Sequence, residues 1–248
     1  EWSTLGKTTK TSWSFKNLKP GMSTRYAVKA YTVVGRTTYY SPAYKYLTAK
    51  TLSPDKVTGL TAVPGSSSVT LTWNDIDDAT GYIVYIYDKS KNEYYQKADV
   101  SSSIAEIGSL KSSTPYSFAV KAYFKGETDT AYSKYYSEIC SVTTLPGAVK
   151  GFSLIEDYTT AESVTLAWTK LSDCGGYIIY LYDAKTKEYN PYHTIKNNEI
   201  TIFTATGLNP DTVYYFKIRA YGTDETNIGE LSDKLRTRTL KNLINEKN

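Results

Sequence analysis

A stretch of fourteen residues occurs three times in this chain of 248 residues, and this repeat is the strongest constraint on its fold. It reads L-K-S-S-T-P-Y-S-F-A-V-K-A-Y at residues 110–123 and L-N-P-D-T-V-Y-Y-F-K-I-R-A-Y at residues 208–221. A weaker copy, L-K-P-G-M-S-T-R-Y-A-V-K-A-Y, occupies residues 18–31. The copies begin 92 and 98 residues apart, which is the length of one small domain. The sequence therefore predicts tandem repeats of one domain type.

The repeated stretch is typical of a β-strand with one buried face. Phe118, Val120 and Ala122 alternate with more polar residues, as expected when successive side chains point to opposite faces of a sheet. A second strand-like run ends in tryptophan before each complete copy, with Trp73 after V-T-L-T and Trp168 after V-T-L-A. These runs indicate an all-β chain, and no significant helix is predicted.

Two proline-containing joins divide the repeats, T-L-S-P at residues 51–54 and T-L-P-G at residues 144–147. They leave almost no linker, so the domains are expected to follow one another as a semi-rigid rod. The predicted division is a partial domain at 1–52, complete domains at 53–145 and 146–240, and a frayed tail at 241–248.

The residues around these strands resemble the fibronectin type III family over nearly the whole chain. Each complete repeat has a core tryptophan, Trp73 or Trp168, followed by a Gly-Tyr pair, and a tyrosine, Tyr116 or Tyr214, at the start of the later strand. The resemblance implies tandem Greek-key β-sandwiches, in which the tyrosine hydroxyl bonds back to the preceding turn. The first repeat departs from this pattern because Thr24 occupies the tyrosine position.

The first repeat aligns only with the later part of the other two. By analogy with the family, residues 1–52 would keep strand C′ near Trp2, strand E through Trp13 and Phe15, and strands F and G, but would lack strands A, B and C. Apolar positions such as Val28 and Leu47 would then have no facing strands. We expect this half-module to become ordered by pairing with another polypeptide segment, either a cut upstream piece of the same precursor, which is favoured, or a strand-donating partner.

Charge and hydropathy limit the classes of partner. The net charge is +4, and residues 1–52 carry nine Lys or Arg against one acid. An acidic partner is nevertheless disfavoured because the cations lie on several strands and turns, and no nucleic acid is predicted as a partner. No apolar run approaches the roughly 20 residues needed to cross a bilayer, so no membrane insertion is predicted.

Catalytic and metal-binding patterns are missing from the sequence. Cys140 and Cys174 align with core positions of different domains, so free, buried, structural thiols are expected rather than a disulfide or a metal site. His193 is expected in a solvated loop without a nucleophile beside it. The acidic group at residues 75–78 does not have calcium-loop spacing. We predict no enzyme activity and no cofactor.

Aromatic residues give the candidate binding surface. If Tyr82 and Tyr177 face inward on strand C, the alternate positions face outward, and strands F and C′ add tyrosines to the same side. The resulting set is Ile83, Tyr85, Tyr87, Tyr94, Tyr123, Ile178, Tyr180, Tyr182 and Tyr221. Tyrosine supplies contact area at little entropic cost and suits recognition. Tyrosine and isoleucine are also good strand formers, and this alternative stays open.

The resemblance extends to repeats of bacterial secreted or cell-surface proteins, where such modules act as spacers or contact proteins and glycans. It implies a non-catalytic extracellular segment that serves as a spacer in a multidomain protein. One alternative is an adhesin or protein-binding module that uses the C′-C-F-G face or the F–G loops. A further alternative is carbohydrate binding by exposed tyrosines. The sequence does not identify a ligand.

Overall fold

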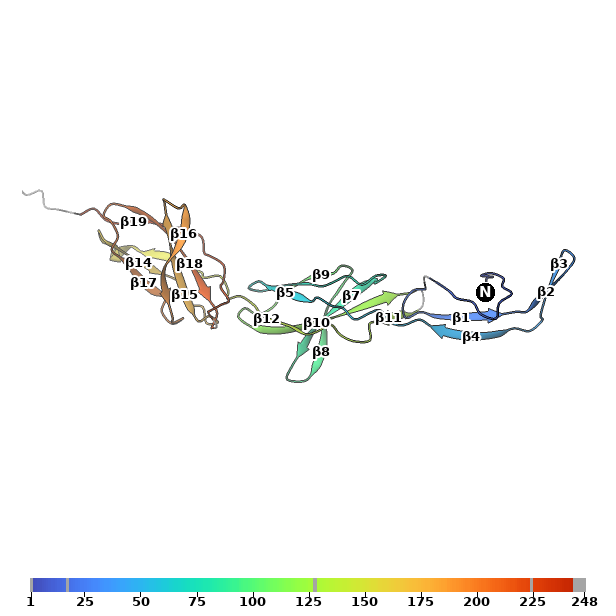
Figure 1. Ribbon diagram of the computed structural model, residues 1–248. Coiled ribbons are helices and arrows are strands. Elements are labelled where there is room, and N and C mark those ends of the chain that lie inside the picture. Colours follow the sequence, from blue (N-terminus) through green and yellow to red (C-terminus); the bar gives the residue numbers. More distant parts are fainter. Residues whose placement is uncertain (1, 17, 127–128, 224, 243–248) are drawn as a thin grey trace, which may run out of the picture. The chain divides into compact units, whose positions relative to one another are not determined.

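The computed structural model describes residues 2–16, 18–126, 129–223 and 225–242 (Figure 1). Within those ranges the protein is all-β, without an α-helix, and its helical content is the short 3-10 turn η1 (Glu156–Tyr158). None of its described segments is an apolar helix of membrane-spanning length. The predicted fold class is confirmed.

The chain divides into two compact units. One contains Glu1–Leu60, Thr72–Ala105 and Phe118–Ile139. The other contains Thr61–Leu71, Glu106–Ser117 and Cys140–Asn248. The division passes through the predicted domain 53–145, so the predicted domain boundaries stay predictions. The predicted tail at 241–248 lies almost entirely outside the described residues.

The second unit contains a complete pair of antiparallel sheets. One sheet has the order β13 (Ser153–Ile155), β14 (Ser163–Ala167) and β17 (Ile202–Thr206). The other has the order β16 (Glu188–Ile195), β15 (Gly176–Asp183), β18 (Val213–Tyr221) and β19 (Leu235–Arg238). Inward-facing residues of both sheets form one core cluster that includes Leu166, Trp168, Tyr177, Ile179, Phe216 and Ile218. This arrangement is a β-sandwich.

The same strand orders recur earlier in the chain. A three-stranded sheet contains β5 (Thr61–Pro64), β6 (Val69–Thr72) and β9 (Ile104–Ile107). A five-stranded sheet contains β11 (Thr130–Tyr132), β10 (Pro115–Lys125), β7 (Gly81–Asp88) and β8 (Glu93–Val100) in that order, with β12 (Cys140–Thr143) also paired to β10. The recurrence matches the predicted repeat, because β10 and β18 are the second and third copies of the repeated stretch.

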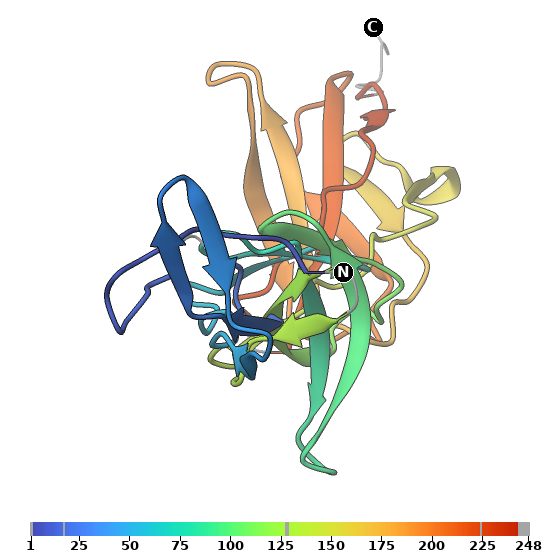
Figure 2. The ribbon, with the colours of Figure 1, turned by 90° about the vertical axis from the view of Figure 1, so that its right-hand side faces the viewer.

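The β7–β8 hairpin shows how local sequence sets these elements (Figure 2). Its turn begins at Asp88, whose carboxylate accepts hydrogen bonds from Ser90 N at 2.9 Å and Ser90 Oγ at 2.6 Å. The turn ends at Asn92, which has a φ of 56°, a left-handed conformation that asparagine tolerates better than most residues. The hairpin is thereby fixed in a register that pairs Tyr87 with Tyr94.

The described residues in the N-terminal part of the first unit form two strand pairs. β1 (Ser23–Val28) pairs with β4 (Lys45–Lys50), and β2 (Tyr31–Val34) pairs with β3 (Thr37–Tyr40). β1 and β4 match the predicted strands F and G. The strands predicted near Trp2 and through Trp13 and Phe15 are wrong, because residues 2–16 contain no strand. A strand needs a hydrogen-bonded neighbour, and this segment has none.

Candidate functional site

The candidate surface lies on two sheets, β8-β7-β10-β11 and β16-β15-β18-β19, which contain the strands expected as C′, C, F and G. It is the outer face of each sheet, which is the side opposite the core. Strand alternation separates the two sides as predicted. Tyr82 and Val84 on β7 are buried, and the rings of Tyr82 and Trp73 lie 5.3 Å apart. Tyr177 and Ile179 on β15 are fully buried. The residues between them in sequence therefore project to the outer face of each sheet.

Four tyrosines in the first unit form a tyrosine cluster on this face: Tyr85, Tyr87, Tyr94 and Tyr136. The rings of Tyr94 and Tyr136 stack at 3.8 Å with 9° between their planes, and the Tyr85 ring meets Tyr136 edge-on at 5.1 Å. Lys121 Nζ lies 4.4 Å from the centre of the Tyr136 ring. Burial, with a smaller contribution from Tyr136, raises the pKa of Tyr85 above its ordinary value. All four rings are half-buried and keep part of their surface in water.

Tyr136 belongs to this cluster although the sequence analysis missed it. It precedes β12, which begins at Cys140. The adjacent tyrosines at 135 and 136 gave no indication of which one faces the sheet. The signal that could have found it is Ser137, whose hydroxyl accepts a hydrogen bond from Val120 N at 3.0 Å and so brings the chain back to β10.

Two other predicted residues of the first unit behave differently from the tyrosine cluster. Ile83 is only 6% exposed, so the prediction that it contributes open apolar surface is wrong. It lies on a central strand between its register partners Asp99 and Lys121. Tyr123 is half-buried, and its hydroxyl donates to Asp99 Oδ1 at 2.9 Å. Burial and then the Asp99 carboxylate raise the pKa of Tyr123.

The corresponding face in the second unit is held by cations placed over tyrosines. The Tyr182 ring lies 5.2 Å from Tyr189 and 6.1 Å from Tyr215. Lys217 Nζ lies 4.9 Å from the centre of the Tyr189 ring, and Lys234 Nζ lies 5.8 Å from the centre of the Tyr215 ring. Ile178 and Tyr182 are half-buried. The face is thus a set of intramolecular cation–π contacts.

Tyr180 and Tyr221 are 5% and 4% exposed, so the prediction that both belong to an exposed surface is wrong. The Arg219 guanidinium lies 4.8 Å from the centre of the Tyr180 ring and donates a hydrogen bond to its hydroxyl. The Tyr221 hydroxyl donates to Ile195 O at 3.2 Å, and the Tyr221 ring covers its register partner Gly176. Both tyrosines are parts of the folded sheet.

The predicted structural residues lie at the following positions. Trp73 and Trp168 are both buried. The Tyr116 hydroxyl accepts a hydrogen bond from Lys111 N at 2.9 Å, and the Tyr214 hydroxyl accepts one from Asn209 N at 2.8 Å. These bonds tie each turn to the strand that follows it, as in a tyrosine corner.

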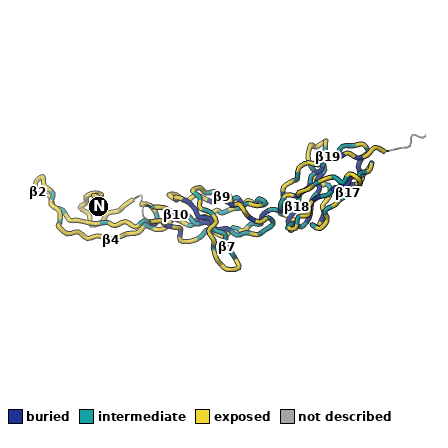
Figure 3. Tube along the Cα trace, turned by 180° about the vertical axis from the view of Figure 1, so that it is seen from behind, coloured by how far each residue is buried: buried dark blue, intermediate teal, exposed yellow. Residues whose placement is uncertain are grey.

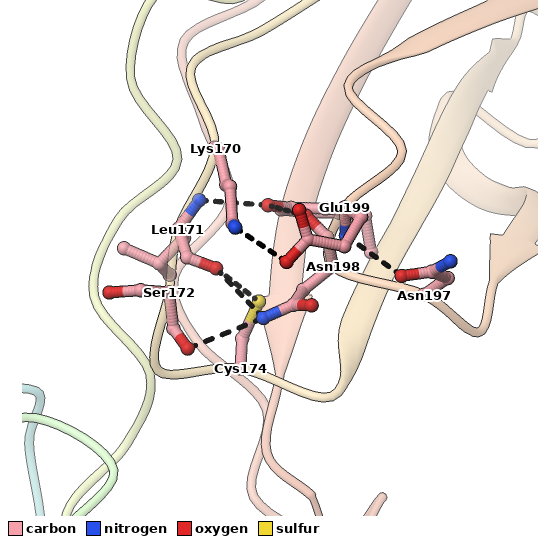
Figure 4. Close-up of polar contacts among 8 residues, drawn as sticks. Lys170, Leu171, Ser172, Cys174, Asn197, Asn198 and Glu199 are labelled. Atoms are coloured by element: carbon pink, nitrogen blue, oxygen red, sulfur yellow. Dashed lines mark hydrogen bonds and ion pairs between the residues drawn. The ribbon is translucent and has the colours of Figure 1, made fainter.

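Both cysteines are free, and Cys174 is buried while Cys140 is only half-buried, which differs from the prediction for Cys140. Figure 4 shows the loop around Cys174, where its Sγ donates to Leu171 O at 3.3 Å and Asn198 Nδ2 donates to the same oxygen at 3.4 Å. Lys170 and Glu199 form an ion pair beside it. Burial raises the pKa of both thiols, so neither is activated as a nucleophile.

The side chains considered for catalysis or metal binding do not lie together in one site. Among the described residues, no three His, Cys, Asp or Glu side chains are grouped so that they could hold a metal ion. His193 is exposed, but it lies on β16 rather than in a loop, with its ring stacked on Phe203 at 4.5 Å. The F–G loop of the middle repeat includes residues 127 and 128, which lie outside the described residues.

Comparison with known families agrees with this geometry. The family model for the fibronectin type III domain matches residues 147–237. These residues are a fibronectin type III domain. The match covers β13 to β18 and all but the last residue of β19, including Trp168 and Tyr214, and it confirms the resemblance inferred from the repeats.

Two curated relatives contain similar segments. Exoglucanase B of Cellulomonas fimi is 27% identical over 238 residues, which cover 92% of this chain and 21% of the relative. Receptor-type tyrosine-protein phosphatase eta of Gallus gallus is 28% identical over 171 residues, which cover 67% of this chain and 11% of the relative. The chain thus spans about a fifth or less of the length of these relatives.

Two solved structures are also similar. A two-domain fibronectin type III segment of chicken tenascin has a TM-score of 0.45 at 18% identity, covering 75% of this chain and 99% of that chain. The FN1–FN3 domains of chicken CNTN1 have a TM-score of 0.37 at 17% identity, covering 90% of this chain and 77% of that chain.

Proposed function

We propose that this chain is a non-catalytic spacer in an extracellular multidomain protein. The observation that carries the proposal is that Thr51 in the first predicted join, and Thr144 and Leu145 in the second, are hydrogen-bonded to the folded repeats. A flexible linker would leave its backbone groups to water, whereas a spacer that holds a distance needs joins with few free torsions. The small share of each named relative that this chain covers supports a modular role.

The first join lies within the first unit. The Thr51 hydroxyl donates to Lys19 O at 2.5 Å and accepts from Met22 N at 2.9 Å. A Cβ on Gly126 would lie 2.2 Å from Met22 Cε, so the Met22 side chain packs directly against that backbone. Lys19 Nζ lies 4.8 Å from the centre of the Phe124 ring. These contacts connect the β1–β4 region to the β10–β11 hairpin without an intervening linker.

The second join lies within the second unit. Leu145 N donates to Gly65 O at 2.9 Å, and Leu145 O accepts from Ser113 N at 3.2 Å. The Ser112 hydroxyl donates to the Asp173 carboxylate, which belongs to the following repeat. The join is therefore bonded on the side of the preceding repeat, and one further hydrogen bond connects that repeat to the next.

Small-angle X-ray scattering of the whole chain tests the spacer proposal. The matched control carries six Gly-Ser residues inserted after Thr144, which lengthens the join without removing any side chain. We expect the control to show a broader distribution of interatomic distances than the natural chain. Indistinguishable distributions would mean that the natural join is already flexible, and the proposal would be wrong.

A second candidate function is protein or glycan binding by the tyrosine cluster. It is favoured by the partial exposure of Tyr85, Tyr87, Tyr94 and Tyr136, which leaves aromatic edges available to a ligand. A spacer would keep its function in the double variant Tyr87→Ser and Tyr94→Ser, although the variant loses the stack of Tyr94 on Tyr136. A binder would lose its partner, so screening the natural chain and the double variant on the same glycan array separates the two functions.

We also propose that the β1–β4 pair is completed by strands from another polypeptide segment. Val28 and Leu47 are 75% and 60% exposed, although they align with core positions of the later repeats. Figure 3 shows β4 coloured as exposed. Burying two such side chains contributes roughly 1.5 to 3 kcal/mol each, which favours any segment that covers them. Amide hydrogen exchange in β1 and β4 of a demonstrated monomer tests this pairing.

A further inference from the structure

Residues 2–52 carry a one-sided charge that the rest of the chain does not share. They include nine Lys or Arg and no Asp or Glu. The sequence alone places these cations at scattered positions, so it does not indicate a binding surface. The strand register changes this picture, because it determines which of the cations share a face.

Three cations and two tyrosines lie on one face of the β1–β4 pair. Ser23 pairs with Lys50, Arg25 with Thr48, and Ala27 with Tyr46, so Arg25, Tyr46 and Lys50 project to the same side. Lys29 and Tyr44 continue the alternation just beyond these strands, and Lys29 Nζ lies 5.5 Å from the centre of the Tyr44 ring. Arg25 Cζ lies 5.2 Å from the centre of the Tyr46 ring. We call this set of five residues the cationic face.

The other side of the same pair is mostly apolar and is partly covered. Tyr26, Val28, Leu47 and Ala49 project there, together with Thr24 and Lys45. The Phe15 ring stacks on Tyr26 at 4.3 Å, which places the segment around Phe15 on this opposite side. The cationic face therefore lies away from Phe15. Trp2 meets the Tyr44 ring edge-on at 5.7 Å, but all five side chains of the cationic face are exposed.

We infer that the cationic face binds an acidic polysaccharide, one that carries sulfate or carboxylate groups along an extended chain. Arg25 lies on β1 and Lys29 directly follows its last residue, and four residues of extended chain span roughly 13 Å. Lys50 lies diagonally across from Arg25 at about 7 to 8 Å. This gives a line of positive charge along a flat surface. The guanidinium of Arg25 suits bidentate pairing with a sulfate or a carboxylate.

The tyrosines favour a sugar polymer over a nucleic acid. Tyr44 and Tyr46 are 44% and 62% exposed, and each has a cation over its ring. Nucleic-acid bases stack on free aromatic faces, which this arrangement occupies on one side. The phenol hydroxyls stay available to donate to and accept from sugar hydroxyls. The choice of a polysaccharide also rests on the extracellular location in the proposed function.

Heparin provides a sulfated polysaccharide as a probe for titration calorimetry with the whole chain. The test variant is Arg25→Gln, Lys29→Gln and Lys50→Gln. The matched control, Lys10→Gln, Lys16→Gln and Lys45→Gln, removes the same charge from the same part of the chain but from outside the cationic face. Thermal unfolding of each protein checks that its fold is intact, and duplex DNA and uncharged dextran are titrated in parallel.

We expect the natural chain and the control to bind heparin, and the test variant to bind it at least roughly tenfold more weakly. The slope of the logarithm of the binding constant against the logarithm of the salt concentration should fall by about one unit per lost contact. Dextran should not bind. The inference is overturned if heparin does not bind the natural chain, if both variants lose affinity equally, or if duplex DNA binds as tightly as heparin. None of these outcomes depends on the rigidity of the joins, so the spacer proposal stands or falls separately.

Discussion

Replacing Gly176 by alanine tests whether Tyr221 serves the fold rather than a ligand. A Cβ at this position would lie 2.0 Å from Ile195 O and 2.5 Å from the Tyr221 hydroxyl oxygen. The first of these is a backbone atom of the paired strand β16, which cannot rotate away as a flexible side chain can. Overpacking of this kind typically costs about 1 to 3 kcal/mol, and we expect at least about 2 kcal/mol because the backbone itself must move.

Alanine substitutions at two other glycines give reference values for this expected loss of stability. At Gly81 the equivalent Cβ would lie 2.7 Å from both Val100 O and the Tyr123 hydroxyl oxygen, so Gly81→Ala should destabilise its own sheet less. At Gly108 no heavy atom lies within 4 Å of the added Cβ. Gly108→Ala should therefore leave stability unchanged, or raise it by up to about 1 kcal/mol through the unfolded state.

Amide hydrogen exchange of the whole chain is the assay, because it reports on each sheet separately. A loss of about 2 kcal/mol corresponds to a roughly thirtyfold loss of protection in β15 and β18 for Gly176→Ala. Protection in β7 and β10 should not change. If Gly176→Ala kept its protection within about twofold, Tyr221 would not be held against the backbone as described, and its role as a surface residue would have to be reconsidered.

Four further predictions follow from the same contacts. Tyr214→Phe removes the acceptor for Asn209 N and should lower the free energy of unfolding by about 1 kcal/mol in urea denaturation, while an unchanged value would exclude a role for the hydroxyl. Cys140 should react with a thiol reagent before Cys174 in the native chain, because Cys140 is half-buried and Cys174 is buried; simultaneous labelling would contradict this order. Burial raises the pKa of Tyr177 above its ordinary value of about 10, so the folded state holds the phenol proton more tightly than the unfolded state does. The contribution of Tyr177 to the free energy of unfolding should therefore be constant below about pH 10 and fall as the pH rises through the higher value. Tyr177→Phe should reduce this alkaline loss of stability in melting experiments at several pH values. Amides in β1 and β4 should exchange much faster than those in β7 and β10 in a demonstrated monomer, and equal protection would show that this strand pair needs no partner.

The architecture could be predicted because it depends on local patterns. Alternation on β7 and β15 follows from the period of a strand, so the burial of Tyr82 and Tyr177 required no knowledge of their neighbours. Each of these tyrosines follows a glycine, and the structure gives the reason. Tyr123 and Tyr221 cross over Gly81 and Gly176 on the paired strand, where a side chain would not fit.

The exposure of the outer face could not be predicted, because it depends on which side chains the register brings together. Ile83 is buried on a central strand, and Tyr180 is buried under Arg219, although alternation alone places both toward solvent. The cationic face could not be predicted for the same reason. Arg25 and Lys50 are far apart in sequence, and they come onto one face only through the pairing of β1 with β4.

A cation over a tyrosine recurs at one position of the repeated strand, and its surroundings decide what it can do. Lys29, Lys121 and Arg219 each stand eleven residues after the first leucine of their repeat. Each covers a tyrosine: Tyr44, Tyr136 and Tyr180 respectively. Tyr180 is 5% exposed and Tyr44 is 44% exposed. When the cation–tyrosine pair is buried, it stabilises the sheet and suits a spacer. When the pair is exposed, its charge and its hydroxyl can contact a ligand. The same contact can therefore support both functions in one chain, and the exposure of the tyrosine, rather than its presence, distinguishes them.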